Sequence, residues 1–239
     1  MSATDAARRP SFTKVQYAAH PGACRARHGV GRPGLRDVLG ESAWRRLPEP
    51  VRARFGDAHL TVDYAGTFEI VRANPLGRLI ARACRLIGTP VAPHTGANVP
   101  AMVHVAPSGA GVEWRREYRW SDRPPSIVRS TKVVGPDCAL VEELPAHLYM
   151  PLDVYEQEHA LHFVSRSYYF AIRLPLIGQL KLALPTWLSP GITHVVHTDQ
   201  GHGWFRFTMI VTHPAFGELF YQTGLFRASG GSRCLPRSF

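Results

Sequence analysis

The chain has 239 residues and a formal net charge of +10 at pH 7, with 45% hydrophobic and 19% charged residues. This apolar fraction supplies a packed core, so the composition excludes a protein that is disordered throughout. All-β architectures reach this length as one domain, and no linker divides the middle of the chain. A single core is therefore expected.

The excess positive charge lies near the N-terminus. Residues 1–54 contain 11 Lys or Arg against 4 Asp or Glu, which leaves 17 against 14 for the other 185 residues. Because the main part of the chain is close to neutral, the sequence does not predict a basic groove, and we expect no nucleic-acid partner.

Composition also sets the expected boundaries. Residues 1–34 are rich in Arg, Ala, Gly and Pro without periodicity, which predicts a flexible basic leader. One β-rich domain is expected over residues 35–229, and a flexible tail over residues 230–239. No apolar signal segment follows Arg8 and Arg9, no apolar run approaches the ~18 residues of a membrane span, and the four cysteines are far apart. These features predict a cytoplasmic protein without a membrane span.

Two short helices are expected at the start of the domain. Residues 35–39 place their apolar side chains on one face. A second helix is expected from Ser42, and Pro48 and Pro50 are expected to interrupt it.

One longer amphipathic helix is predicted over residues 74–88. Asn74 suits the N-cap, Pro75 the first helical position, and Gly88 the position after the last turn. An apolar stripe recurs at helical spacing, with arginines on the other face, so one side of this helix should pack against a sheet.

The remaining elements are expected to be strands joined by short turns, which favours an antiparallel meander. The predicted strands are 57–71, 99–106, 112–120, 126–134, 139–143, 148–157, 161–174, 192–198, 203–213 and 217–227. Large side chains alternate onto both faces, as with Phe205 and Phe207 on one face and Trp204 and Ile210 on the other. Because one long helix cannot cover both faces, the sheet must curl.

The fold prediction is therefore a mainly β protein. We expect a strongly curved antiparallel sheet, or a barrel-like meander of about 9–10 strands, around the one amphipathic helix.

One strand motif draws attention as a possible binding site. Trp114, Arg116 and Tyr118 follow at a two-residue spacing, so their side chains project from the same face. If that face is concave, the guanidinium needs a carboxylate partner or an anionic ligand head group, and Glu142 or Glu143 could supply the carboxylate. The alternative is that Arg116 stacks on the rings at the surface of the sheet.

Other reactive residue types form no motif that predicts catalysis. His194 and His197 are three residues apart on a strand and so face opposite ways, which disfavours a shared metal ion. No GxSxG, P-loop or EF-hand pattern is present. We therefore predict no metal site and no cofactor, name no catalytic residue, and leave open whether the protein is an enzyme.

Several motifs resemble a known family over roughly residues 39–227. They are Trp114-x-Arg116-x-Tyr118, Pro185-x-x-Leu188-x-Pro190, the Arg46-Leu47-Pro48 segment, the helix after Asn74, and a closing stretch with Pro214, Gly217, Leu219, Tyr221 and Gly224. This pattern resembles the uncharacterised bacterial family called domain of unknown function 4166. Tyr118 stands where the family has an aromatic residue, often Phe, and the family's acidic position matches Glu142 or Glu143.

The resemblance implies a β-rich fold and no established activity. Members of such families also occur joined to NAD(P)-binding oxidoreductase modules. This chain has no GxGxxG motif, so it would meet an oxidoreductase partner in trans.

The leading functional hypothesis is that an apolar or amphipathic small molecule binds in a cavity between the curved sheet and the helix. The candidate ligand-binding residues are Trp114, Arg116, Tyr118, Glu142, Glu143 and Tyr221. The first alternative is a small enzyme or accessory domain that acts with an NAD(P)-dependent oxidoreductase. The second alternative is a structural domain with a solid core.

Overall fold

The computed structural model describes residues 33–56, 60–88, 91–109, 111–135, 137–174, 178–185 and 187–230. Almost all of the expected leader and tail therefore lies outside the described residues. The twelve described strands are β1 Val62–Ala73, β2 Gly96–Ser108, β3 Gly111–Tyr118, β4 Ser126–Val134, β5 Leu140–Leu144, β6 Leu148–Gln157, β7 Ala160–Ser165, β8 Tyr169–Leu174, β9 Gly178–Ala183, β10 Ile192–Gly201, β11 Trp204–His213 and β12 Gly217–Ala228.

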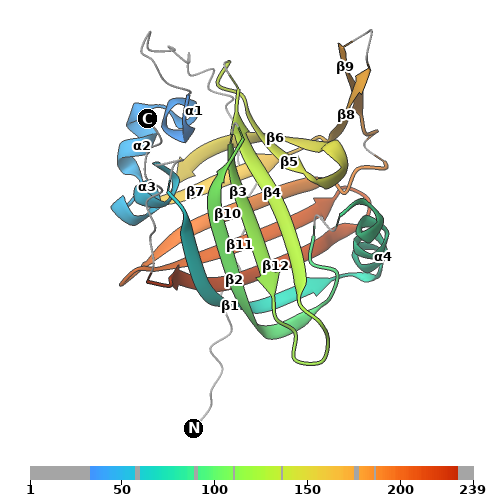
Figure 1. The fold of residues 1–239 in the computed structure, drawn as a ribbon, viewed down its shortest axis with the longest axis horizontal. Coiled ribbons are helices and arrows are strands. Elements are labelled where there is room, and N and C mark those ends of the chain that lie inside the picture. The colour runs from blue at the N-terminus through green and yellow to red at the C-terminus, as the bar shows by residue number, and fades with distance from the viewer. Residues whose placement is uncertain are drawn as a thin grey trace.

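Ten of these strands form a closed antiparallel barrel (Figure 1). The sheet runs in the order β5-β4-β3-β2-β1-β12-β11-β10-β7-β6, and the pairing of β5 with β6 closes it. Closure buries the inner apolar face of the sheet, because side chains from opposite sides of the barrel pack against one another. The predicted mainly β, barrel-like fold is confirmed.

Between β7 and β10 the chain leaves the barrel and forms two further strands. Residues 161–174 were expected to form one strand, but the structure divides them into β7 and β8. Between these strands the Ser165 hydroxyl donates to the carbonyl of Ser167 over 3.0 Å. Strand β8 pairs with β6 at only two positions and then forms a hairpin with β9, a strand that the sequence analysis did not predict.

Aromatic side chains fill the middle of the barrel. The rings of Phe68 and Tyr118 stack with their centroids 4.6 Å apart, and Phe226 meets Phe68 edge-on at 5.0 Å. Phe163 and Phe205 are also almost completely buried. The barrel interior is therefore packed along much of its length.

Three short helices cover one end of the barrel (Figure 1). They are α1 Leu35–Leu39, α2 Glu41–Arg46 and α3 Glu49–Gly56. Trp44, Leu47 and Val51 belong to the same buried cluster as the barrel interior. The expected end of the helix before Pro48 is confirmed, because α2 ends at Arg46 and Leu47 is extended. The next helix, α3, was not predicted; Pro50 lies in its first turn, where a proline breaks no backbone hydrogen bond.

The amphipathic helix forms as α4, Pro75–Cys84, followed by the short 3₁₀ helix η1, Arg85–Ile87. The Asn74 side chain caps it by accepting from the Gly77 N–H over 2.7 Å. Helix α4 packs on the outside of the barrel, where Ala81 joins Val211, Leu219 and Phe220 in a second buried cluster. The barrel does not enclose this helix.

Close contact fixes the position of α4. A Cβ atom on Gly77 would lie only 2.2 Å from the Leu219 carbonyl oxygen, so only glycine allows this approach. A second 3₁₀ helix, η2 Pro145–His147, connects β5 and β6. Within the described residues, no helix is long and apolar enough to cross a membrane.

Candidate ligand-binding cavity

The Trp114 motif lies on the inner face of β3. Trp114 and Tyr118 are buried, and the Tyr118 hydroxyl donates to the Gln222 side-chain carbonyl over 2.9 Å. The Arg116 guanidinium lies 5.6 Å from the Phe207 ring centroid, and its Nη1 is 3.5 Å from the Ser130 hydroxyl. The three side chains therefore project into the barrel, as the two-residue spacing predicts.

Glu142 also lies inside the barrel, but its ion pair is with Lys132. The Lys132 Nζ is 3.0 Å from Glu142 Oε1, and both side chains are nearly inaccessible. The expected ion pair between Arg116 and Glu142 is not the one formed. The register explains this, because Lys132 on β4 stands directly opposite Glu142 on β5, whereas Arg116 is one strand further away and stands opposite Val128.

The other two candidate residues lie on the outside. Glu143 accepts a hydrogen bond from the Tyr149 hydroxyl over 3.0 Å. Tyr221 packs beneath the Arg72 guanidinium, which is 4.3 Å from its ring centroid. Because neighbouring residues on a strand alternate, Glu142 and Gln222 point inward where Glu143 and Tyr221 do not. The structure thus brings together Trp114, Arg116, Tyr118 and Glu142, and separates Glu143 and Tyr221 from them.

The ion pair is held in apolar surroundings. Burial lowers the pKa of Lys132, the positive charge of Arg116 lowers it further, and Glu142 opposes both effects. Burial alone would raise the pKa of Glu142, but the charges of Lys132 and Arg116 and a hydrogen bond from Ser130 hold it below its usual value. The carboxyl is therefore ionised at neutral pH.

His197 is a buried polar residue that the sequence analysis did not select. Its ring lies 4.9 Å from the ring of Phe55 and 5.3 Å from that of Phe207. Burial holds the pKa of His197 well below its usual value, and the positive charges of Arg54, Lys132 and Arg116 act in the same direction. Its Nδ1 has no hydrogen-bond partner among the described residues. The signal for its burial was the alternation along β10, which places His194 on the opposite face.

His194 lies outside the barrel, close to His162. The His162 Nδ1 and His194 Nε2 atoms are 3.0 Å apart, and the Tyr155 hydroxyl is 3.4 Å from His194 Nε2. Among the residues that the structure describes, no group of three or more His, Cys, Asp or Glu side chains is arranged to hold a metal ion.

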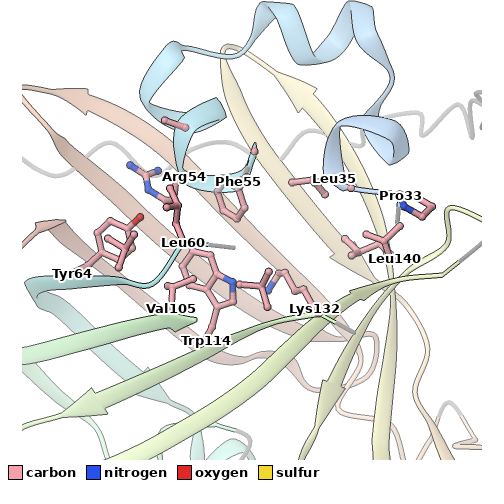
Figure 2. A pocket seen from close by; sticks show the side chains of 17 residues that line it. Pro33, Leu35, Arg54, Phe55, Leu60, Tyr64, Val105, Trp114, Lys132 and Leu140 are labelled. Atoms are coloured by element: carbon pink, nitrogen blue, oxygen red, sulfur yellow. The ribbon is translucent and has the colours of Figure 1, made fainter. Parts of the chain in front are cut away.

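A cavity of about 120 Å³ lies at the end of the barrel that α1–α3 cover. Figure 2 shows Leu35 and Phe55 of the helices facing Trp114 and Lys132 of the strands across it. Its lining residues are Pro33, Gly34, Leu35, Ala53, Arg54, Phe55, Gly56, Leu60, Val62, Tyr64, Val105, Gly111, Val112, Trp114, Lys132, Val134 and Leu140. The lining is mainly apolar and aromatic, with two cationic side chains.

Arg54 and Lys132 are these two cations. The Arg54 guanidinium lies 3.6 Å from the Phe205 ring centroid, and burial lowers its pKa to about 10, so it stays charged at neutral pH. Arg116 does not line this cavity. It lies deeper, beside a void of about 10 Å³ that it shares with Trp114 and His197.

Lys132, Arg54 and Phe55 were therefore absent from the expected site. Lys132 could have been found by extending the alternation of β4 from Val128 through Ser130. Arg54 and Phe55 gave no comparable signal, because their helix had not been predicted.

Comparison with known proteins identifies a family. Residues 47–226, well over half of the chain, match the family model described as "Domain of unknown function (DUF4166)". No curated protein and no solved structure matches the chain. On the extent of the family match, this chain belongs to the DUF4166 family.

Proposed function

We propose that the barrel binds an apolar or amphipathic small molecule in the cavity beneath α1–α3. The observation that carries this proposal is the cavity lining, in which apolar and aromatic side chains surround two cations. Binding sites for small molecules typically combine such an apolar wall with a few polar groups that fix orientation. A polar or anionic head group would lie toward Arg54 or Lys132.

The size of the cavity narrows the class of ligand. An engineered apolar cavity of about 150 Å³ holds benzene, whereas pockets that enclose drug-sized ligands occupy roughly 300–1,000 Å³. A cavity of about 120 Å³ therefore suits a single ring or a short alkyl chain. A longer molecule would place only its end there and extend past the rim.

Titration with benzyl alcohol tests the proposal. The Trp114 indole N–H resonance, assigned through Trp114→Phe, should shift and saturate, because Trp114 forms part of the cavity wall. The indole of Trp187 should not shift, since this side chain is 75% exposed and does not line the cavity.

Filling the cavity provides the matched control. Val112→Phe should abolish the Trp114 shift, because Val112 lines the cavity. Val133→Phe, on the opposite face of the adjacent strand, should leave the shift intact. If Trp114 does not respond, and native mass spectrometry of the purified protein finds no retained molecule, the interior is a structural core and the binding proposal is wrong.

A further inference from the structure

We propose that Lys132 binds a carbonyl compound in this cavity as an imine, with Glu142 as the adjacent proton acceptor and counterion. The inference rests on the proposed function, because it assumes that a small molecule reaches the cavity. It adds a ligand class, namely an aldehyde or ketone with a ring-sized or short-chain apolar group.

The position of the amine supports the proposal. Lys132 lines the cavity, and its side chain is only 11% exposed. Its Nζ lies 5.7 Å from the ring of Trp114 and 5.2 Å from the ring of Phe163. An apolar carbonyl compound in the cavity would thus meet a primary amine between aromatic walls.

The use of lysine at this position is a second observation. The chain contains 25 arginines but only three lysines, Lys14, Lys132 and Lys181. An arginine could also form a buried ion pair with Glu142, and its planar guanidinium often suits such pairs better. Only lysine can release a proton at accessible pH and act as a nucleophile. The buried position therefore carries the basic residue that the rest of the chain rarely uses.

The surroundings favour a reactive amine. Burial lowers the pKa of Lys132 and the charge of Arg116 acts in the same direction; Glu142 opposes them, but the net direction is downward. Burial and a neighbouring positive charge are the effects that activate lysine nucleophiles. Glu142 Oε1, 3.0 Å from Nζ, is placed to accept the ammonium proton. Arg116 and Ser130 help to hold the pKa of Glu142 below its usual value, so the carboxylate form is present beside the amine and a proton that it accepts is readily returned.

The proposed step balances without another reactant. Lys132 transfers one proton to Glu142, and the neutral amine attacks the carbonyl carbon to form a carbinolamine. Glu142 returns the proton as the C–O bond breaks and one water leaves. The products are a protonated imine on Lys132, the Glu142 carboxylate beside it, and water. No electron is gained or lost, and hydrolysis reverses the step.

Reductive trapping with benzaldehyde tests this inference. The full chain is incubated with benzaldehyde and cyanoborohydride, and peptides are mapped by mass spectrometry. We expect a benzyl adduct on Lys132 that forms at least about tenfold faster than the adduct on Lys181, whose amine lies outside the barrel. Lys132→Arg, which keeps the positive charge, should lose this adduct, whereas Lys181→Arg should retain it.

The outcomes separate the imine from simple binding. If benzyl alcohol shifts Trp114 but benzaldehyde modifies Lys132 no faster than Lys181, the imine inference is overturned and the proposed function stands. If neither compound reaches the cavity, both fail. Because the rates at Lys132 and Lys181 are compared within the wild-type chain, the test does not depend on whether the Lys132→Arg variant folds.

Discussion

At the residue scale, the buried ion pair of Lys132 and Glu142 affects the free energy of unfolding. Each charge has lost its water, and the attraction of the other compensates for that loss. Removing one partner leaves the other as an unpaired buried charge. Replacing both with apolar side chains leaves no buried charge, so there is no desolvation cost to compensate.

Glu142→Leu should therefore destabilise the protein by about 3 kcal/mol at neutral pH. Adding Lys132→Met to that variant should recover most of the loss. Urea unfolding measures both changes. Glu218→Leu is the matched control, because its ion pair with Arg72 is exposed and should contribute less than about 1 kcal/mol. A double variant as unstable as the single one would contradict this account.

His197 makes a separate, pH-dependent contribution. In the folded protein its pKa lies well below 6.5, so it stays neutral, whereas the unfolded chain takes up a proton as the pH falls below about 6.5. The unfolded state then binds more protons, and stability falls with falling pH by up to about 1.4 kcal/mol per pH unit from this one group.

His197→Phe should remove that part of the pH dependence. It should also relieve an unpaired buried nitrogen, because an apolar ring would replace the imidazole among the surrounding aromatic rings. The unfolding free energy of the variant minus that of the wild type, measured between about pH 7 and pH 5, should increase as the pH falls. Parallel curves would show that His197 does not titrate in this way.

The alternation of residues along a strand predicted that Arg116 and a glutamate face inward, but it did not predict their interaction partners. It placed Arg116 and one of the two adjacent glutamates inside. The partner of Glu142 depends on the register between β4 and β5, which sets Lys132 opposite it. Register is a property of two strands together, so the single-strand pattern did not contain it.

At the element scale, helices α1–α3 extend the buried core of the barrel and also form part of the cavity wall. Their buried side chains continue the main apolar cluster, and Phe55 stacks on Trp114 with the ring centroids 5.4 Å apart. These helices therefore depend on the barrel for their stability, because segments this short do not hold a helix alone.

Leu47→Ala tests this dependence. Leu47 is 2% exposed, so truncating it should lower the free energy of unfolding by about 2–5 kcal/mol. Leu86→Ala is the matched substitution at a leucine that is 91% exposed, and its effect should stay within about 0.5 kcal/mol. Urea unfolding checks both variants, and equal effects would show that the helices do not pack on the barrel as a unit.

The sequence predicted the start of helix α4 correctly, but it predicted neither helix α3 nor the position of α4 relative to the barrel. Asn74 and Pro75 correctly marked the start of α4, because capping is a local interaction. Helix α3 was missed because Pro50 was taken as an interruption rather than as a first-turn residue. The location of α4 outside the barrel depends on the approach of Gly77 to Leu219, which is a contact between distant parts of the chain.

At the scale of the whole molecule, alternating large side chains on both faces predicted a curled sheet. They did not predict which strands complete the ring. Closure depends on the pairings of β1 with β12 and of β5 with β6, and the first of these joins strands from the two ends of the domain. Such long-range pairing leaves no signature in any local window of sequence.

The expected boundary of the folded domain gives one further prediction. Removal of residues 1–32 should change the melting temperature by less than about 2 °C, because this segment lacks the periodicity of a packed element. Pro33 must be kept, since it lines the cavity, and so must Gly34, whose N–H donates to the Asp37 carboxylate over 2.8 Å. Differential scanning calorimetry of the full and shortened chains measures the change. A fall of more than about 5 °C would place part of the segment in the folded domain.

Closing the barrel also has a consequence for solubility. Each of the ten barrel strands has a neighbour on both sides, so none of them is an edge strand of the sheet. Strand β9 pairs only with β8, and it displays Leu180 and Leu182, each about half exposed, with Lys181 between them. Within the described strands, the tendency of this protein to aggregate through edge-to-edge sheet growth is therefore concentrated in one short hairpin, where the lysine charge opposes it.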